Sequence, residues 1–143
     1  MIKIRLATPP DIKNLVEFGI KEKQEKEILP EIPANKEEIS YWFAECIISS
    51  GNYVFLAEEN GEICGFLVLS EMQCPWNSNY RYLTDLMFLA RKGGVKLIRT
   101  AKKFAERKNL NSIVLSVSTK KDRSDKFLNH IGQYIGGAYE IKV

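Results

Sequence analysis

Short apolar runs and helical periodicities divide this chain of 143 residues into ten segments. Alternating or continuous apolar runs predict six strands, at residues 2–7, 53–58, 62–70, 80–90, 112–118 and 138–143. Apolar residues three and four positions apart predict four amphipathic helices, at about residues 8–20, 35–50, 94–108 and 121–134. Because strands alternate with helices in the second half, we expect a single α/β domain. Its mixed, mostly antiparallel sheet would be flanked by helices, in the order β-α-α-β-β-β-α-β-α-β.

Turn-forming residues separate these segments. Asn60-Gly61 lies between two strand patterns and predicts a hairpin. Asn35, with Glu38 three positions on, resembles the capping box that begins a helix. Residues 21–34 are charged and end in prolines, and residues 71–79 are rich in Asn and Ser, so we expect loops in both places.

Charge is distributed unevenly along the chain. The net charge is +3, yet residues 91–126 hold 12 Lys or Arg against 3 Asp or Glu, while the other residues carry a balance of −6. A basic segment of this kind is typical of an anion-binding surface. A small basic nucleic-acid-binding module therefore stays open as an alternative, although no aromatic residues are interleaved with the cations of this segment.

Several classes of protein do not fit the composition. No apolar run approaches the roughly 18 residues of a membrane span, so no membrane partner is expected. Three cysteines without paired spacing and a single histidine, His130, make a zinc site an unattractive interpretation, and we expect no metal. Unpaired cysteines are typical of reduced thiols, which predicts a cytoplasmic protein.

The chemically informative segment is the loop between strand 80–90 and helix 94–108. Gly93 and Gly94 allow backbone N–H groups to point toward one spot, where the helix dipole adds positive potential. The cations Arg91, Lys92 and Lys96 flank this spot, so the loop could hold a pyrophosphate. The alternative is an ordinary tight turn, for which two glycines are equally suited.

With this loop, the order of elements resembles the GNAT superfamily of acyl-CoA N-acyltransferases over essentially the whole chain. Residues 91–96 partly match the superfamily's loop motif [Q/R]xxGx[G/A], with Lys96 where a small residue is usual. Residues 123–132 resemble its C-terminal ending, although Leu128 stands where a tyrosine often serves as general acid. A shortened loop with this ending is similar to GNAT-like proteins encoded by phages and prophages.

The resemblance implies an N-acetyltransferase that transfers an acetyl group from acetyl-CoA to a primary amine of a small molecule or a protein by direct attack. It implies binding of acetyl-CoA by the central strand and the loop, through Met87, Phe88, Leu89, Arg91, Lys92, Gly93, Gly94, Val95 and Lys96. Asp85 and Tyr82 are the expected catalytic residues, with Glu71 as a further candidate base. Strand alternation places Tyr82 and Asp85 on opposite faces.

Two further expectations concern partners and activity. No specific nucleic acid is expected as a partner, a homodimer stays open, and a phage-encoded protein would work in the cytoplasm of its bacterial host. Since Leu128 cannot donate a proton, a catalytically inactive GNAT-like structural or interaction protein is the main alternative to an enzyme.

Overall fold

Among the residues that the structure describes, five strands form one open sheet in the order β1-β2-β3-β4-β5. The computed structural model describes residues 1–116, 128, 130–133 and 141–142. The strands are β1 (Ile2–Leu6), β2 (Asn52–Glu59), β3 (Glu62–Cys74), β4 (Asn77–Ala90) and β5 (Ser112–Val114). The helices are α1 (Ile12–Glu25), which follows a short 3₁₀ turn (Pro9–Asp11), α2 (Lys36–Ile48) and α3 (Gly94–Arg107). Neighbouring strands are antiparallel except for the parallel pair β4 and β5, so the expected α/β class with a mixed sheet is confirmed.

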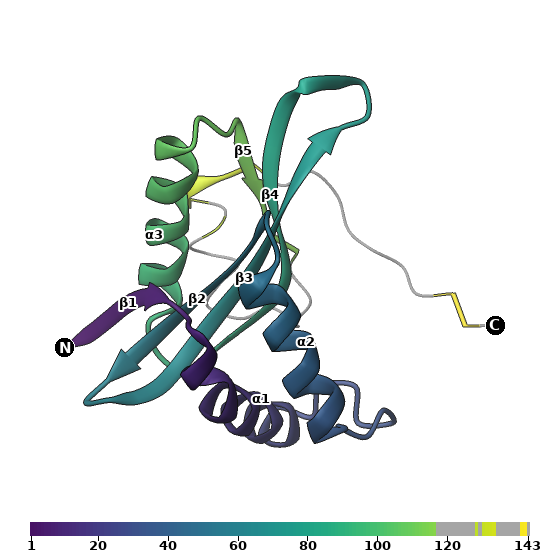
Figure 1. The fold of residues 1–143 in the computed structure, drawn as a ribbon, viewed down its shortest axis with the longest axis vertical. Coiled ribbons are helices and arrows are strands. Elements are labelled where there is room, and N and C mark those ends of the chain that lie inside the picture. The colour runs from purple at the N-terminus through teal and green to yellow at the C-terminus, as the bar shows by residue number, and fades with distance from the viewer. Residues whose placement is uncertain (117–127, 129, 134–140, 143) are drawn as a thin grey trace.

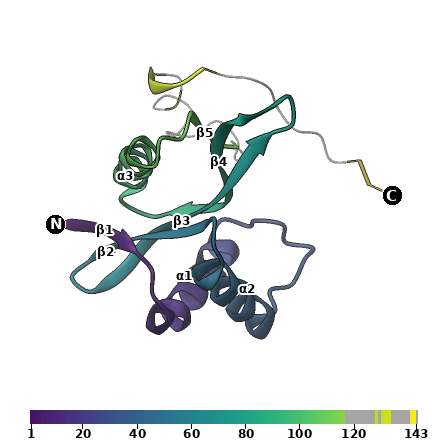
Figure 2. The same ribbon diagram turned by 45° about the horizontal axis from the view of Figure 1, so that its top comes forward.

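Helices cover both faces of the sheet, as Figure 2 shows: α1 and α2 lie on one face and α3 on the other. We call these the α1–α2 face and the α3 face. The core on the α1–α2 face consists of Leu15, Val16, Phe43, Cys46, Val54, Leu56, Phe66 and Val68. The core on the α3 face consists of Phe55, Ala57, Leu67, Leu69, Leu83, Leu97, Ala101 and Ala105. None of the described helices is long and apolar enough to cross a membrane.

Two of the predicted turn and cap signals are confirmed. Asn60 and Gly61 have φ values of 53° and 80° and form the two-residue turn between β2 and β3; positive φ at both positions is the requirement of a type I′ hairpin turn. The side chain of Asn35 accepts hydrogen bonds from the N–H groups of Glu37 (3.1 Å) and Glu38 (3.2 Å), which caps α2.

Two predicted loops are partly wrong. Helix α1 continues to Glu25, so the first loop begins only at Lys26. Residues 71–79 are mostly strand: β3 and β4 pair out to Cys74 and Asn77, which leaves two residues, Pro75 and Trp76, in the turn. Asn and Ser in this stretch suggest a loop by composition. A backbone ladder between two projecting strands, however, does not require apolar side chains, and the long hairpin is plain in Figure 1.

The C-terminal predictions are only partly covered. The strand expected at 112–118 is described as Ser112–Val114, and residues 117 and 118 lie outside the described residues. The helix expected at 121–134 is described only at residues 128 and 130–133, where Leu128, His130 and Ile131 are helical. Of the strand expected at 138–143, only residues 141 and 142 are described, and neither is in a strand.

An ion-pair cluster fixes the start of the chain to the sheet. The Arg5 guanidinium donates to both carboxylate oxygens of Asp11 (2.8 and 2.9 Å) and to Glu58 on the neighbouring strand. The hydrogen bonds from Arg5 lower the pKa of Asp11 from 3.8 to about 2. The cluster therefore ties β1, β2 and the turn before α1 together.

We predict that this cluster makes the stability of the protein sensitive to acid. Since the pKa of Asp11 is lower in the folded than in the unfolded chain, its contribution is complete well above pH 3.8 and is lost as the pH falls toward about 2. Asp11→Asn should lower the free energy of unfolding at neutral pH by about 0.5–1 kcal/mol, because Arg5 is partly exposed. Urea unfolding followed by circular dichroism measures this difference, which should close near pH 2; an equal loss at both pH values would contradict the prediction.

Candidate functional site

Strand β4 loses one of its two neighbours halfway along its length. It pairs with β3 from Asn77 to Ala90, but with β5 only through Tyr82, Leu83 and Thr84, which lie opposite Ser112, Ile113 and Val114. Beyond Thr84, no pairing with β5 continues among the described residues. One edge of β4 over residues 85–90 is therefore not occupied by β5.

A β-bulge lies where this pairing stops. Val68 is opposite Met87 and Leu69 is opposite Asp85, so Leu86 is the extra residue. The bulge sets side-chain direction on either side of it. Asp85 lies opposite a residue of the α3-face core, whereas Met87 lies opposite a residue of the α1–α2 core.

Asp85 is held by the segment that leaves β5. Its carboxylate accepts hydrogen bonds from the backbone N–H of Ser116 (2.8 Å) and from the Ser116 hydroxyl (3.0 and 2.9 Å). These contacts lie two residues beyond the last β4–β5 pair. Asp85 therefore joins the two strands at the point where their ladder ends.

The other candidate acid–base residues lie on different faces. Tyr82 alternates with the buried Leu83 of the α3 face, so its side chain belongs to the α1–α2 face. Glu71, opposite Leu83, pairs with Arg81 and accepts a hydrogen bond from the Tyr53 hydroxyl at 3.1 Å. Glu71 is thus part of a polar cluster on the α3 face, and the structure does not bring it together with Tyr82.

The strand residues expected to hold the cofactor differ in what they expose. Phe88 packs against the α3-face core and Leu89 against the α1–α2 core. Met87 is 36% exposed. The side chains of Phe88 and Leu89 are thus used in packing, and these positions offer a ligand mainly their backbone groups.

Within the part of the chain that the structure describes, the first backbone N–H groups of α3 have no hydrogen-bond partner. Gly93 adopts the left-handed conformation (φ 82°), and the bond from the N–H of Leu97 to the carbonyl of Gly93 (2.9 Å) closes the first turn. The N–H groups of Gly94, Val95 and Lys96 precede this bond and have no partner within the helix. Together with the helix dipole, they form a site that favours an anion.

The cationic side chains of the loop are engaged elsewhere. Arg91 pairs with Glu22 and Glu25 of α1, at 2.5 Å from a carboxylate oxygen of each. Lys92 pairs with Glu59 at 2.9 Å. The ammonium of Lys96 donates to the carbonyl of Ile2 (3.2 Å). The expected loop residues are therefore gathered around one place, where the side-chain cations are engaged and the first N–H groups of α3 are not bonded within the helix.

Sequence reasoning missed Glu22, which is 1% exposed and lies at the C-terminal end of α1. Only its position on the apolar face of that helix, seven residues after Leu15, could have drawn attention to it. Sequence order gives no sign that it meets Arg91, which is 69 residues away.

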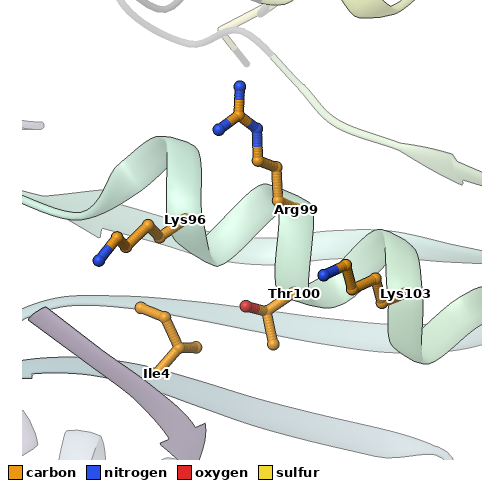
Figure 3. Close-up of a pocket in the computed structure, with 5 residues that line it drawn as sticks. All are labelled: Ile4, Lys96, Arg99, Thr100 and Lys103. Carbon is orange, nitrogen blue, oxygen red and sulfur yellow. The ribbon is translucent and has the colours of Figure 1, made fainter.

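The cations of α3 line a separate open pocket of about 330 Å³ beside β1. Figure 3 shows Lys96, Thr100 and Lys103 on the helix above Ile4, with the Arg99 side chain pointing away from Ile4. This pocket borders neither β4 nor β5, so it is not the region where β4 loses its neighbour. Among the described residues, no group of three His, Cys, Asp or Glu side chains gathers closely enough to hold a metal ion.

Comparison with known proteins agrees with this geometry. Residues 4–138 match the family described as the acetyltransferase (GNAT) domain. No curated protein matches the chain in sequence. Many solved structures share its fold, at sequence identities that support the fold alone.

Three of these structures illustrate the range of relatives. A ribosomal-protein-alanine N-acetyltransferase from Brucella melitensis biovar Abortus 2308 aligns with a TM-score of 0.75 and 15% identity over 100% of this chain and 99% of that one. A GNAT family acetyltransferase from Staphylococcus aureus aligns with a TM-score of 0.69 and 18% identity over 99% of this chain and 97% of that one. An aminoglycoside acetyltransferase from an uncultured soil metagenomic sample, in complex with sisomicin, aligns with a TM-score of 0.66 and 16% identity over 99% of this chain and 97% of that one. With the family matched over nearly its whole length, this chain belongs to the GNAT acetyltransferase domain family.

Proposed function

We propose that this protein transfers an acetyl group from acetyl-CoA to a primary amine by direct attack. One observation carries the proposal: the free N–H groups at the start of α3 lie directly after a strand edge that β5 leaves unpaired. A long ligand with a phosphate at one end and an amide-containing arm at the other matches an anion site that continues into a strand edge.

The residues present suit such a ligand. Gly93, Gly94 and Val95 carry no charge, and Val95 is 40% exposed beside the helix N-terminus. We propose that the N–H groups of Gly94, Val95 and Lys96 bind the pyrophosphate of CoA, with Arg91 and Lys92 supporting the loop. The backbone of Met87, Phe88 and Leu89 would pair with the arm.

The chemistry that acetyl-CoA supplies is a thioester: the amine nitrogen forms a bond to its carbonyl carbon, the carbon–sulfur bond breaks, and one amine proton leaves as CoA departs with the electron pair. The chain's part is to hold donors where negative charge develops on the carbonyl oxygen. Backbone N–H groups of β4 beyond Thr84, where the strand is no longer paired with β5, would supply these donors. No covalent bond to the protein is required.

Tyr82 and Asp85 have different parts in this proposal. Tyr82 lies on the α1–α2 face, two residues before the end of the β4–β5 ladder, and its hydroxyl would take the proton that the amine loses while passing its own proton to the sulfur of the departing CoA. Asp85 binds Ser116, and its carboxylate would act by holding β4 and the segment after β5 together where their pairing ends. The hydroxyl of Tyr82 would thus act from one face of β4 and the carboxylate of Asp85 from the other.

The acceptor is an amine in this proposal. The segment from the end of α1 to the start of α2 carries exposed carboxylates, Glu25, Glu27, Glu31, Glu37 and Glu38, and their charge suits a cationic amine. The named relatives act on amines of two sizes, a ribosomal protein and an aminoglycoside. We therefore propose a small-molecule or protein amine.

The setting we propose is the cytoplasm, in a bacterial host if the protein is phage-encoded. Cys46, Cys64 and Cys74 are free thiols in the structure. Burial raises the pKa of the Cys46 and Cys64 thiols, which disfavours the reactive thiolate form. This supports a mechanism without a cysteine nucleophile.

If the pyrophosphate of CoA binds at the N-terminus of α3, a negative charge at position 94 should weaken binding without destabilising the fold. An added Cβ at Gly94 would be in ordinary contact with Phe88 (3.4 Å) and Ala90 (3.5 Å). Gly94→Asp should leave the melting temperature unchanged or higher, since a carboxylate suits a helix N-terminus. It should weaken acetyl-CoA binding by about tenfold or more through repulsion of the phosphates. Isothermal titration calorimetry measures the dissociation constant of acetyl-CoA for the wild type and for the variant.

The matched control is Gly94→Asn, which has the same shape without the charge. It should bind acetyl-CoA more tightly than Gly94→Asp. Equal binding by the two variants would show that no phosphate lies at this helix N-terminus. Wild-type protein whose melting temperature is unchanged by saturating acetyl-CoA would remove the enzyme proposal and leave an inactive GNAT-like protein.

The proposed roles of Tyr82 and Asp85 predict different kinetic changes. Tyr82→Phe should lower kcat by about 100-fold without raising the KM for acetyl-CoA, because only a proton relay is lost. Ser116→Ala serves as the comparison for Asp85→Asn, since it removes the partner hydroxyl but keeps the carboxylate. If Asp85 acts through the junction, both variants should lower kcat by similar factors with an unchanged pH profile. A shifted pH profile in Asp85→Asn alone would make Asp85 the general base instead.

A further inference from the structure

Glu22 is the only fully buried charged side chain among the described residues, and it lies against the phosphate loop. Arg91 donates to its Oε1 from Nε (2.9 Å) and Nη2 (2.5 Å). The Lys26 ammonium lies 2.9 Å from its Oε2. One carboxylate at the end of α1 therefore meets two cations, one from its own helix and one from the loop.

The cluster is ionised and tightly held. Burial by itself would raise the pKa of Glu22, but the ion pair with Lys26 and the hydrogen bonds from Arg91 outweigh it and hold that pKa below its ordinary value. Glu25, which is half-exposed, also pairs with Arg91. A buried carboxylate that lost its cations would be strongly destabilising, so Arg91 is bound to α1 more firmly than an exposed ion pair would bind it.

The same cluster fixes the backbone that leads into α3. Lys26 also donates to the carbonyl of Ala90, the last residue of β4 (3.2 Å). From the other side, the N–H groups of Arg91 and Lys92 both donate to the carbonyl of Cys64 (2.8 and 3.1 Å). An added Cβ at Gly65 would lie 3.0 Å from the Lys92 carbonyl, so the loop sits directly on β3. The path of residues 90–92 is thus determined from two directions.

We infer that Glu22 is a positioning residue for phosphate binding: it holds Arg91 as a strut between α1 and the loop, so that the N–H groups of Gly94, Val95 and Lys96 bind the phosphate. Arg91 matches the loop motif by sequence, yet it serves here by fixing the loop rather than by touching the anion. This inference rests on the proposed binding of acetyl-CoA.

A double-mutant cycle tests the strut. Glu22→Gln, Arg91→Gln and the double variant are titrated with acetyl-CoA by calorimetry at low and at physiological salt. Each single variant should weaken binding by about tenfold, and the double variant no more than either single, because both break one unit. The salt dependence of binding should stay that of the wild type, since no phosphate-contacting charge is removed.

A direct contact between Arg91 and phosphate gives the opposite pattern. Glu22→Gln would then free the guanidinium and leave binding unchanged or tighter, while Arg91→Gln would weaken binding and flatten its salt dependence. That pattern overturns the inference. So does additivity of the two single variants.

Kinetics and controls separate positioning from general loss of structure. Glu22→Gln should raise the KM for acetyl-CoA with kcat little changed at saturation, whereas a fall in kcat alone would contradict the strut. Glu17→Gln, an exposed carboxylate on the same helix, should leave KM and melting temperature unchanged. Arg91 is 44% exposed, so Arg91→Gln is expected to fold even if Glu22→Gln does not. Failure of the wild type to bind acetyl-CoA would overturn the proposed function as well, while binding without the coupled pattern would overturn this inference alone.

Discussion

Burial of the central strands on both faces is the constraint on which the rest of the molecule depends. Neighbouring residues of β2 and β3 point to opposite faces and are both buried: Leu56 and Phe55 on one strand, Phe66 and Leu67 on the next. Such a sheet has to be covered by helices on both sides. Helices α1 and α2 close one core and α3 closes the other, and this places the ends of α1 and α3 beside the last residues of β4.

Strand β4 pairs with β3 along its whole length but with β5 over only part of it. Its pairing with β3 fixes its position, so its departure from β5 after Thr84 does not loosen it. The bulge at Leu86 and the contact from Ser116 to Asp85 occur at this junction. A strand that is rigid through one neighbour and open on the other can offer its backbone to a ligand without losing its place in the fold.

The charges of the loop between β4 and α3 are largely paired within the protein. Three nearby cations would form a strongly positive patch if they were free, but Arg91 and Lys92 are neutralised by carboxylates of α1 and β2. What remains for an anion is a set of oriented N–H groups and the dipole of α3. Oriented amides have fixed positions, whereas long cationic side chains would have to be ordered on binding at an entropic cost.

Local patterns in the sequence determined most of the secondary structure and the place of the glycine turn between β4 and α3. Asn60-Gly61, Asn35 and the apolar face of α3 each act within a few residues, so a single sequence was enough to predict the hairpin, the cap and the helix. The long β3–β4 hairpin was missed because its tip is held by backbone pairing, which leaves little trace in side-chain composition. The register of β4, the face of Met87 beyond the bulge, and the pairing of Arg91 with Glu22 were decided only by the tertiary structure. The physical reason is that each depends on a partner distant in the chain, which nothing in the local sequence selects.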